Sequence, residues 1–148
     1  GGKTTLLREL VRLASQDVNV SLVDERSELA GSYLGQPQFD VGPSTDVLDG
    51  CPKAQGMMLM IRSMAPQVLA VDEIGHSQDL EALHHALACG IVVFATIHGL
   101  DQRELQKRPG LQALIAQGLF QRILVLKGYG SKRLKPDIYE GKTLHKLY

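Results

Sequence analysis

The hydrophobic and polar positions of this chain predict an alternation of amphipathic helices and buried strands. Residues 3–15 carry apolar side chains at every third or fourth position, which predicts a helix with one buried face. Four further segments predict helices: 51–64, 77–88 with Ser77 as its cap, 100–106 and 111–117. Four short apolar segments predict buried strands: 19–23, 67–73, 91–95 and 122–126. This alternation indicates an α/β protein with a mainly parallel sheet.

Two segments do not follow these periods. Residues 27 to about 50 show no sustained periodicity and contain repeated glycine and proline, which predicts a long irregular loop. The hydrophobic residues of this loop argue against disorder, so we expect it to be packed and ordered. Residues 138–144 predict a C-terminal β-hairpin around Glu140 and Gly141. The total of 148 residues fits one domain, 1–148.

Charge and composition narrow the class of partner. The formal net charge is zero, and the basic cluster is confined to Lys132, Arg133 and Lys135, so nucleic acid is not favoured as a partner. Cys51 and Cys89 lie far apart, and free thiols in a reducing compartment are expected rather than a disulfide. The longest apolar run, 91–97, is far shorter than the roughly 20 residues of a membrane helix. We therefore expect no direct membrane insertion.

The first five residues, Gly1, Gly2, Lys3, Thr4 and Thr5, match the second half of a phosphate-binding loop followed by a helix. In this Walker A motif, backbone N–H groups hold phosphate oxygens, the lysine reaches the β- and γ-phosphates and the hydroxyl binds Mg²⁺. A helix N-terminus favours an anion for the same reasons. The alternative is a capping threonine on an ordinary amphipathic helix. Since the chain starts inside the motif, we expect its first glycine and its strand to lie upstream.

Polar residues follow three of the predicted strands. Asp72 and Glu73 end an apolar strand, which is the Walker B pattern of an Mg²⁺-binding aspartate and an adjacent glutamate. The other strand ends carry Asp24 with Glu25 and Thr96 with His98. Because parallel strands place their carboxyl ends on one edge, we expect these residues to line a single crevice facing the phosphate-binding loop. The alternative is that each strand simply ends in solvated charge.

Together these segments resemble the stage III sporulation protein AA ATPases of endospore-forming bacteria. The resemblance covers essentially the whole chain and is carried by GKTTLLR at 2–8, VDERSE at 23–28, DVLDGCPKAQGM at 46–57, IRSM at 61–64, VDEIG at 71–75 and TIHG at 96–99. It implies a RecA-like P-loop NTPase, similar to the hexameric ATPases of type II and type IV secretion, whose first Walker A strand is missing here. It also implies that the long loop lies near the nucleotide and the subunit interface.

The resemblance further implies where such a protein works. It implies a cytoplasmic ring in the mother cell, in which the chain is a homo-hexamer. It implies recruitment to the membrane through a membrane-embedded sporulation channel protein that the ATPase energises. The acidic and histidine boxes of the secretion ATPases look like Asp24, Glu25 and Glu28 and like Thr96 and His98.

The resulting hypothesis is Mg²⁺-dependent hydrolysis of ATP. Lys3 would neutralise phosphate charge, Thr4 and Asp72 would hold the metal, and Glu73 would polarise the attacking water, with Glu25 as the rival base. His98 would contact the γ-phosphate, and three arginines are candidates for a charge supplied across a subunit interface: Arg26, Arg62 and Arg108. Arg62, which lies among apolar neighbours, would otherwise reach solvent or pair with a carboxylate.

Three other functions are compatible with parts of the pattern. A nucleotide-gated subunit could assemble a ring while hydrolysing ATP very slowly, which the acidic pair Asp72 and Glu73 disfavours without excluding it. A small-molecule kinase lacks a recognisable acceptor site. A DNA translocase is disfavoured by the zero net charge.

Overall fold

The structure is a computed structural model that describes residues 2–99, 102–126 and 136–148. The chain divides into two compact units, residues 4–98 and residues 1–3 with 99–148, and each is described by itself. Gly1 and the basic cluster of Lys132, Arg133 and Lys135 lie outside the described residues. The single domain expected for 1–148 stays a prediction.

The larger unit is built on a parallel four-stranded sheet. Its strands are β1 (Val20–Asp24), β2 (Thr45–Asp49), β3 (Val68–Val71) and β4 (Val92–Ala95), in the order β2-β1-β3-β4. In this register Leu22 lies opposite both Val47 and Ala70, and Ala70 lies opposite Phe94. The α/β class and the parallel sheet predicted from the alternating pattern are therefore confirmed.

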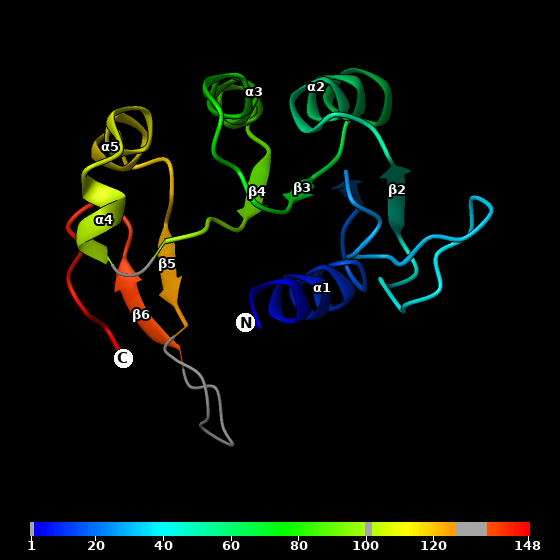
Figure 1. Cartoon of the computed structure of the whole chain (residues 1–148), viewed down its shortest axis with the longest axis horizontal. Helices are drawn as coiled ribbons and strands as arrows, with labels where there is room; N and C mark the ends of the chain where they lie inside the picture. The colour runs from blue at the N-terminus through cyan, green and yellow to red at the C-terminus, as the bar shows by residue number, and fades with distance from the viewer. Residues whose placement is uncertain (1, 100–101, 127–135) are drawn as a thin grey trace. The chain divides into compact units, whose positions relative to one another are not determined.

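Helices cover both faces of this sheet (Figure 1). Helix α1 (Lys3–Ala14) packs on one face, where Leu7 and Val11 join a buried cluster with Leu22 and Ala70. Helices α2 (Lys53–Met64) and α3 (Ser77–Ala88) lie against each other on the opposite face. Because helices cover both faces of the sheet, the side chains of β3 are buried on either face. The sequence of β3 is therefore continuously apolar and does not alternate with polar residues.

Strand β2 is absent from the sequence prediction, which assigned its residues to the irregular loop. That assignment was wrong for Thr45–Asp49, which pair in parallel with all of β1. The segment is only partly buried and carries polar residues at both ends, so it lacks the apolar signal of β1 and β3. A neighbouring strand supplies the missing stabilisation through the ladder of backbone hydrogen bonds. A smaller correction concerns α3, whose N-cap is His76 rather than Ser77.

The part of the loop before β2, residues 27–44, packs in part against α1. Leu29, Ala30 and Val41 are buried in the core cluster under α1. The Arg8 guanidinium donates a hydrogen bond to the Leu29 carbonyl oxygen at 2.6 Å and lies 4.2 Å from the centroid of the Phe39 ring. The loop is thus packed at Leu29, Ala30 and Val41, but the prediction fails for Tyr33 and Leu34, whose side chains are exposed.

Gly42 is the tightest point of contact between this loop and α1. Its φ is +93°, and a Cβ added there would lie 2.6 Å from the Ser15 side chain and 2.9 Å from the Arg12 carbonyl oxygen. We therefore expect Gly42→Ala to lower the free energy of unfolding by about 2–4 kcal/mol, from overpacking added to left-handed backbone strain. Urea unfolding followed by circular dichroism measures this loss.

Gly35→Ala is the matched control. Gly35 also has a positive φ, +78°, but nothing lies within 4 Å of its added Cβ. The Gly35→Ala variant should lose only about 1–2 kcal/mol of stability, because alanine is strained in this backbone conformation. Equal losses in the two variants would show that the contact with Ser15 and Arg12 contributes nothing.

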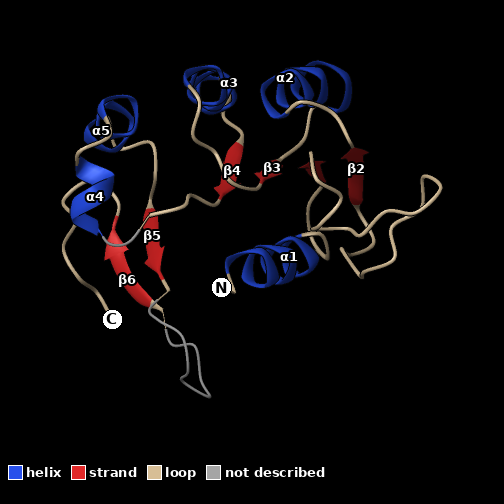
Figure 2. Cartoon of the chain, in the orientation of Figure 1, coloured by secondary structure: helices blue, strands red, loops and turns tan. Residues whose placement is uncertain are grey.

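The smaller unit contains helices α4 (Gln102–Gln106) and α5 (Pro109–Ala116) and an antiparallel pair, β5 (Arg122–Val125) with β6 (Asp137–Glu140) (Figure 2). The predicted hairpin is present only in part. The chain turns after Glu140 and returns along β6, where Tyr139 and Lys146 form a single bridge, but the main partner of β6 is β5. Hydrogen bonds from the Thr143 hydroxyl and N–H lower the pKa of Glu140 in this turn.

Strand β4 ends the described sheet and has a paired neighbour, β3, on one side. Its apolar residues are less covered than those of β1 and β3, and Val92 is 52% exposed. Among the described strands, β4 is therefore paired on one side only and is apolar along its length.

Candidate functional site

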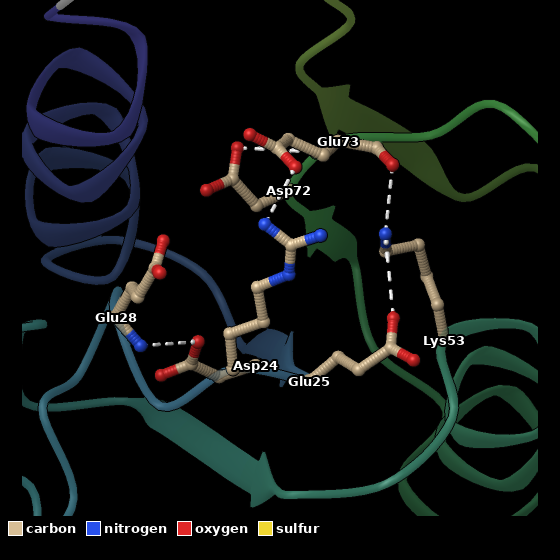
Figure 3. Close-up of a pocket in the computed structure, with 7 residues that line it drawn as sticks. Asp24, Glu25, Glu28, Lys53, Asp72 and Glu73 are labelled. Atoms are coloured by element: carbon tan, nitrogen blue, oxygen red, sulfur yellow. Dashed lines mark hydrogen bonds and ion pairs between the residues drawn. The ribbon is translucent and has the colours of Figure 1, made fainter.

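A pocket lies beyond the carboxyl ends of β1 and β3, next to the first turn of α2 (Figure 3). Five carboxylates among the described residues line it: Asp24, Glu25 and Glu28 after β1, and Asp72 and Glu73 after β3. The cationic side chains of Arg26 and Lys53 share the lining. Because the strands of this sheet are parallel, their carboxyl ends meet at one edge, and residues from distant parts of the sequence come together there.

The two halves of the predicted phosphate and metal site are in direct contact. The Thr4 hydroxyl in the first turn of α1 donates a hydrogen bond to Asp72 Oδ2 at 3.0 Å. The other carboxylate oxygen of Asp72 accepts from the Thr96 hydroxyl at the end of β4. Thr96 Oγ1 in turn accepts the backbone N–H of Glu73 at 2.8 Å. Three segments, the start of α1 and the ends of β3 and β4, are therefore joined through one carboxylate.

This arrangement fits a metal ion bound together with a phosphate group. A hydroxyl and a carboxylate are hard oxygen ligands of the kind that Mg²⁺ prefers, and Mg²⁺ usually takes only one or two carboxylates alongside substrate phosphates. Within the described ranges, no group of three or more His, Cys, Asp or Glu side chains is placed to hold a metal ion by itself. Thr4 and Asp72 thus suit a nucleotide-bound cation.

The start of α1 fits the phosphate. Gly2 has a φ of +94°, so the backbone turns tightly just before the helix begins at Lys3. No acidic residue lies in the first turn of α1, which leaves the positive end of the helix dipole uncompensated. The free N–H groups of that turn and the Lys3 ammonium are therefore suited to an anion.

Asp24 has a structural task in the pocket wall. It is 2% exposed, and its carboxylate accepts hydrogen bonds from the backbone N–H groups of Glu28 at 3.1 Å, Leu29 at 3.1 Å and Ala30 at 2.9 Å. These bonds fold the chain back directly after β1. Both oxygens are occupied, so Asp24 supports the loop, whereas the sequence pattern suggested a solvated or catalytic charge.

The two candidate bases are each held by a cation. Glu73 Oε2 forms an ion pair with Arg26 at 3.1 Å, and Glu25 Oε2 pairs with Lys53 at 3.4 Å. Lys53 also donates a hydrogen bond from Nζ to the backbone carbonyl oxygen of Glu73 at 2.7 Å. Figure 3 shows Lys53 reaching between Glu25 and Glu73, so that one ammonium bridges the ends of β1 and β3.

The remaining predicted residues lie elsewhere. Thr5 is exposed on α1, and His98 is exposed just past the end of β4; neither is among the described residues that line the pocket. Arg62 lines a groove between α2 and α3 together with Glu81 and His85. Arg108 is the N-cap residue of α5 in the other compact unit. Of the three predicted arginines, Arg26 is the one placed in the pocket, where it contacts Glu73 of its own chain.

Two residues of this site were missed as individual contributors by the sequence analysis. The sequence places Lys53 in a predicted helix and in a family motif but assigns it no contact. A lysine at the first position of a helix is opposed by the helix dipole. That unfavourable placement was an available signal of a specific partner. Thr96 was noted as a polar strand end, but its double contact with Asp72 and the Glu73 N–H depends on strand register, which the sequence does not reveal.

Comparison with known proteins places the chain in a family. The family model described as "Sporulation stage III, protein AA" matches residues 1–145. The Stage III sporulation protein AA of Bacillus subtilis (strain 168) is 49% identical over 139 residues, which cover 88% of this chain and 45% of that protein. Protein SEEDLING PLASTID DEVELOPMENT 1 of Arabidopsis thaliana is 28% identical over 122 residues, covering 77% of this chain and 17% of that protein. The chain thus spans less than half the length of these relatives.

Among solved structures, the Legionella pneumophila ATPase DotB matches with a TM-score of 0.56 at 21% identity. The match covers 84% of this chain and 38% of that chain. At this level of identity the likeness shows the fold, an α/β P-loop fold as the family resemblance implies.

Proposed function

Since the chain belongs to the stage III sporulation protein AA family, we propose that it hydrolyses ATP with Mg²⁺ at the pocket beyond β1 and β3. The observation that carries this proposal is the 3.0 Å hydrogen bond between Thr4 and Asp72. It joins the hydroxyl of the phosphate-binding motif to the aspartate of the acidic motif. The fold shared with the ATPase DotB supports the same function.

The proposed roles follow from position. Lys3 and the N–H groups at the start of α1 bind the phosphates, and Thr4 and Asp72 hold Mg²⁺. Bound Mg²⁺ neutralises charge on the phosphate oxygens. Glu73, adjacent to Asp72, accepts the proton of the attacking water. Glu25 stays the rival base, because its carboxylate lines the same pocket.

The proposed roles of the arginines and of His98 concern the γ-phosphate and the subunit interface. We propose that Arg26, released from Glu73, supplies positive charge to the γ-phosphate. His98 stays a proposed phosphate contact just past the end of β4. Arg62 and Arg108 stay candidates for action on a neighbouring subunit.

One contact favours a second candidate function. The candidate base Glu73 is paired with Arg26 at 3.1 Å, so its carboxylate is engaged by a cation of its own chain. A protein with this pairing would hydrolyse ATP slowly and use nucleotide binding to assemble a ring. Phosphate release close to zero, with assembly that still depends on nucleotide, would favour this second function.

The assembly and the location are proposals drawn from the family. We propose a homo-hexamer in the cytoplasm of the mother cell, docked on a membrane-embedded sporulation channel protein. In the described part of the chain, no helix has both the length and the apolar character needed to cross a membrane. Docking through a partner protein is the proposed means of recruitment.

The test is Mg²⁺-dependent phosphate release from ATP by the full-length protein. Asp72→Asn is expected to lower the turnover about 100-fold or more, because several kcal/mol of metal-derived stabilisation depend on that carboxylate. Asp46→Asn is the matched control, since Asp46 is an exposed carboxylate on β2 outside the pocket. Equal turnover of the two variants would contradict the metal site.

A further inference from the structure

Lys53 occupies an electrostatically unfavourable position. It is the first residue of α2, where the helix dipole is positive, and the first turn contains no acidic residue to offset it. Its side chain is only 13% exposed. A half-buried lysine at such a position is stabilised by its contacts, and the two that the structure gives, to Glu25 and to Glu73, are in the pocket.

Those contacts join two elements that meet at the pocket. Lys53 Nζ lies 3.4 Å from the Glu25 carboxylate, just after β1, and donates at 2.7 Å to the Glu73 carbonyl oxygen, just after β3. Glu25 and Glu73 are the two candidate bases. The Lys53 ammonium therefore contacts both residues that the sequence offers as candidates for the general base.

The backbone of Glu73 shows why such a contact matters. Its φ is +48°, a left-handed conformation that non-glycine residues rarely adopt. The residue is held on both sides: its N–H donates to Thr96 Oγ1 at 2.8 Å and to Asp72 Oδ1 at 3.1 Å, and its carbonyl oxygen accepts from Lys53. Such strained conformations persist where the surroundings fix them. Lys53 is thus one of the groups that hold the backbone from which the Glu73 carboxylate extends, and it holds the carbonyl side.

We propose that Lys53 is a positioning residue, which fixes the Glu73 peptide and the Glu25 carboxylate in the geometry required for hydrolysis. The inference rests on the proposed ATPase function of the same pocket. Lys53 itself does not contact the nucleotide in this proposal. It acts by clamping the Glu73 carbonyl oxygen, so its effect requires an intact Glu73 side chain.

The first test is kinetic and uses the full-length protein with Mg²⁺ and ATP. Lys53→Met is expected to lower kcat about 10- to 100-fold, as for a displaced catalytic group, while the dissociation constant of ATP changes less than about threefold. Lys53→Arg, which can donate to both partners, is expected to recover part of kcat. Lys146→Met is the control, because Lys146 pairs with Asp137 in the smaller unit and lies outside the pocket.

A double-variant comparison separates positioning from a general structural effect. In a Glu73→Gln background, Lys53→Met is expected to cause little further loss of kcat, since the group that it positions is already inactive. An equal fold-loss in both backgrounds would overturn the proposal. So would an unchanged kcat in Lys53→Met alone.

Hydrogen exchange tests the clamp without any turnover. Lys53→Met is expected to raise the exchange rate of the Glu73 amide at least about tenfold, because residue 73 loses the contact that holds its carbonyl side. The exchange of the β1 amides should not change, which shows that the unit stays folded. If the wild-type protein released no phosphate, the ATPase proposal would fail, and an unchanged Glu73 exchange rate would separately overturn the role of Lys53.

Discussion

Replacing Glu73 by glutamine is expected to lower the turnover of ATP about 10²- to 10⁴-fold, the usual contribution of a general base. The side chain follows directly after Asp72 and lines the pocket, and a glutamine amide there cannot accept a proton. Phosphate release by the full-length protein at saturating ATP and Mg²⁺ measures the effect. Nucleotide affinity should be retained, because the proposed phosphate contacts come from the start of α1 and not from Glu73.

Two variants make this result decisive. Glu81→Gln changes an exposed glutamate on α3 outside the pocket and should leave turnover unchanged. Glu25→Gln removes the rival base and its ion pair with Lys53, so it tests the alternative assignment. Turnover of Glu73→Gln within about tenfold of the parent, together with a larger loss in Glu25→Gln, would transfer the role of base to Glu25.

Replacing Asp24 by alanine is expected to lower the free energy of unfolding by about 3–5 kcal/mol. The Asp24 carboxylate accepts hydrogen bonds from three backbone N–H groups after β1. Each buried donor that loses its partner costs about 1–3 kcal/mol. Water that enters the space left by the carboxylate can bind some of these donors and reduce the cost. Because the chain contains no tryptophan, urea unfolding is best followed by circular dichroism. A loss below about 1 kcal/mol would show that other groups hold this turn.

The Asp24 prediction has two internal controls. Asp24→Asn keeps one acceptor oxygen and should fall between alanine and the parent in stability. Asp46→Ala removes an exposed carboxylate from the neighbouring strand β2 and should change stability by no more than about 0.5 kcal/mol. Asp24→Ala is also expected to weaken hydrolysis, since the loop that it supports carries Arg26 and Glu28 into the pocket.

The sequence predicted those helices and strands whose own residues carry a clear apolar pattern. The apolar β3 and the stripe of α1 are examples, since burial on the sheet requires those residues at those positions. β2 escaped prediction because its stability comes from pairing with β1, and its own residues are partly polar. The pairing of β6 with β5 escaped for the same reason.

The site was predictable to the same extent. Thr4 and Asp72 belong to motifs with a fixed chemistry, and the structure brings them into contact. The partners of Glu73 were not predictable, because Arg26 and Lys53 reach it from segments that only the folded sheet brings together. A charge near a strand end can support a loop, as Asp24 does, or face the pocket, as Glu25 does, and the sequence does not distinguish the two.

The composition of β4 indicates which kind of neighbour suits its unpaired side. An apolar edge strand offers unpaired backbone donors and acceptors to any other strand, and natural sheets often protect such edges with lysine or proline. β4 consists of Val92, Val93, Phe94 and Ala95, without a charged residue. β4 therefore has the composition of an interior strand, its second side is suited to pairing with a further strand, and a lysine in place of Val92 is expected to weaken that pairing.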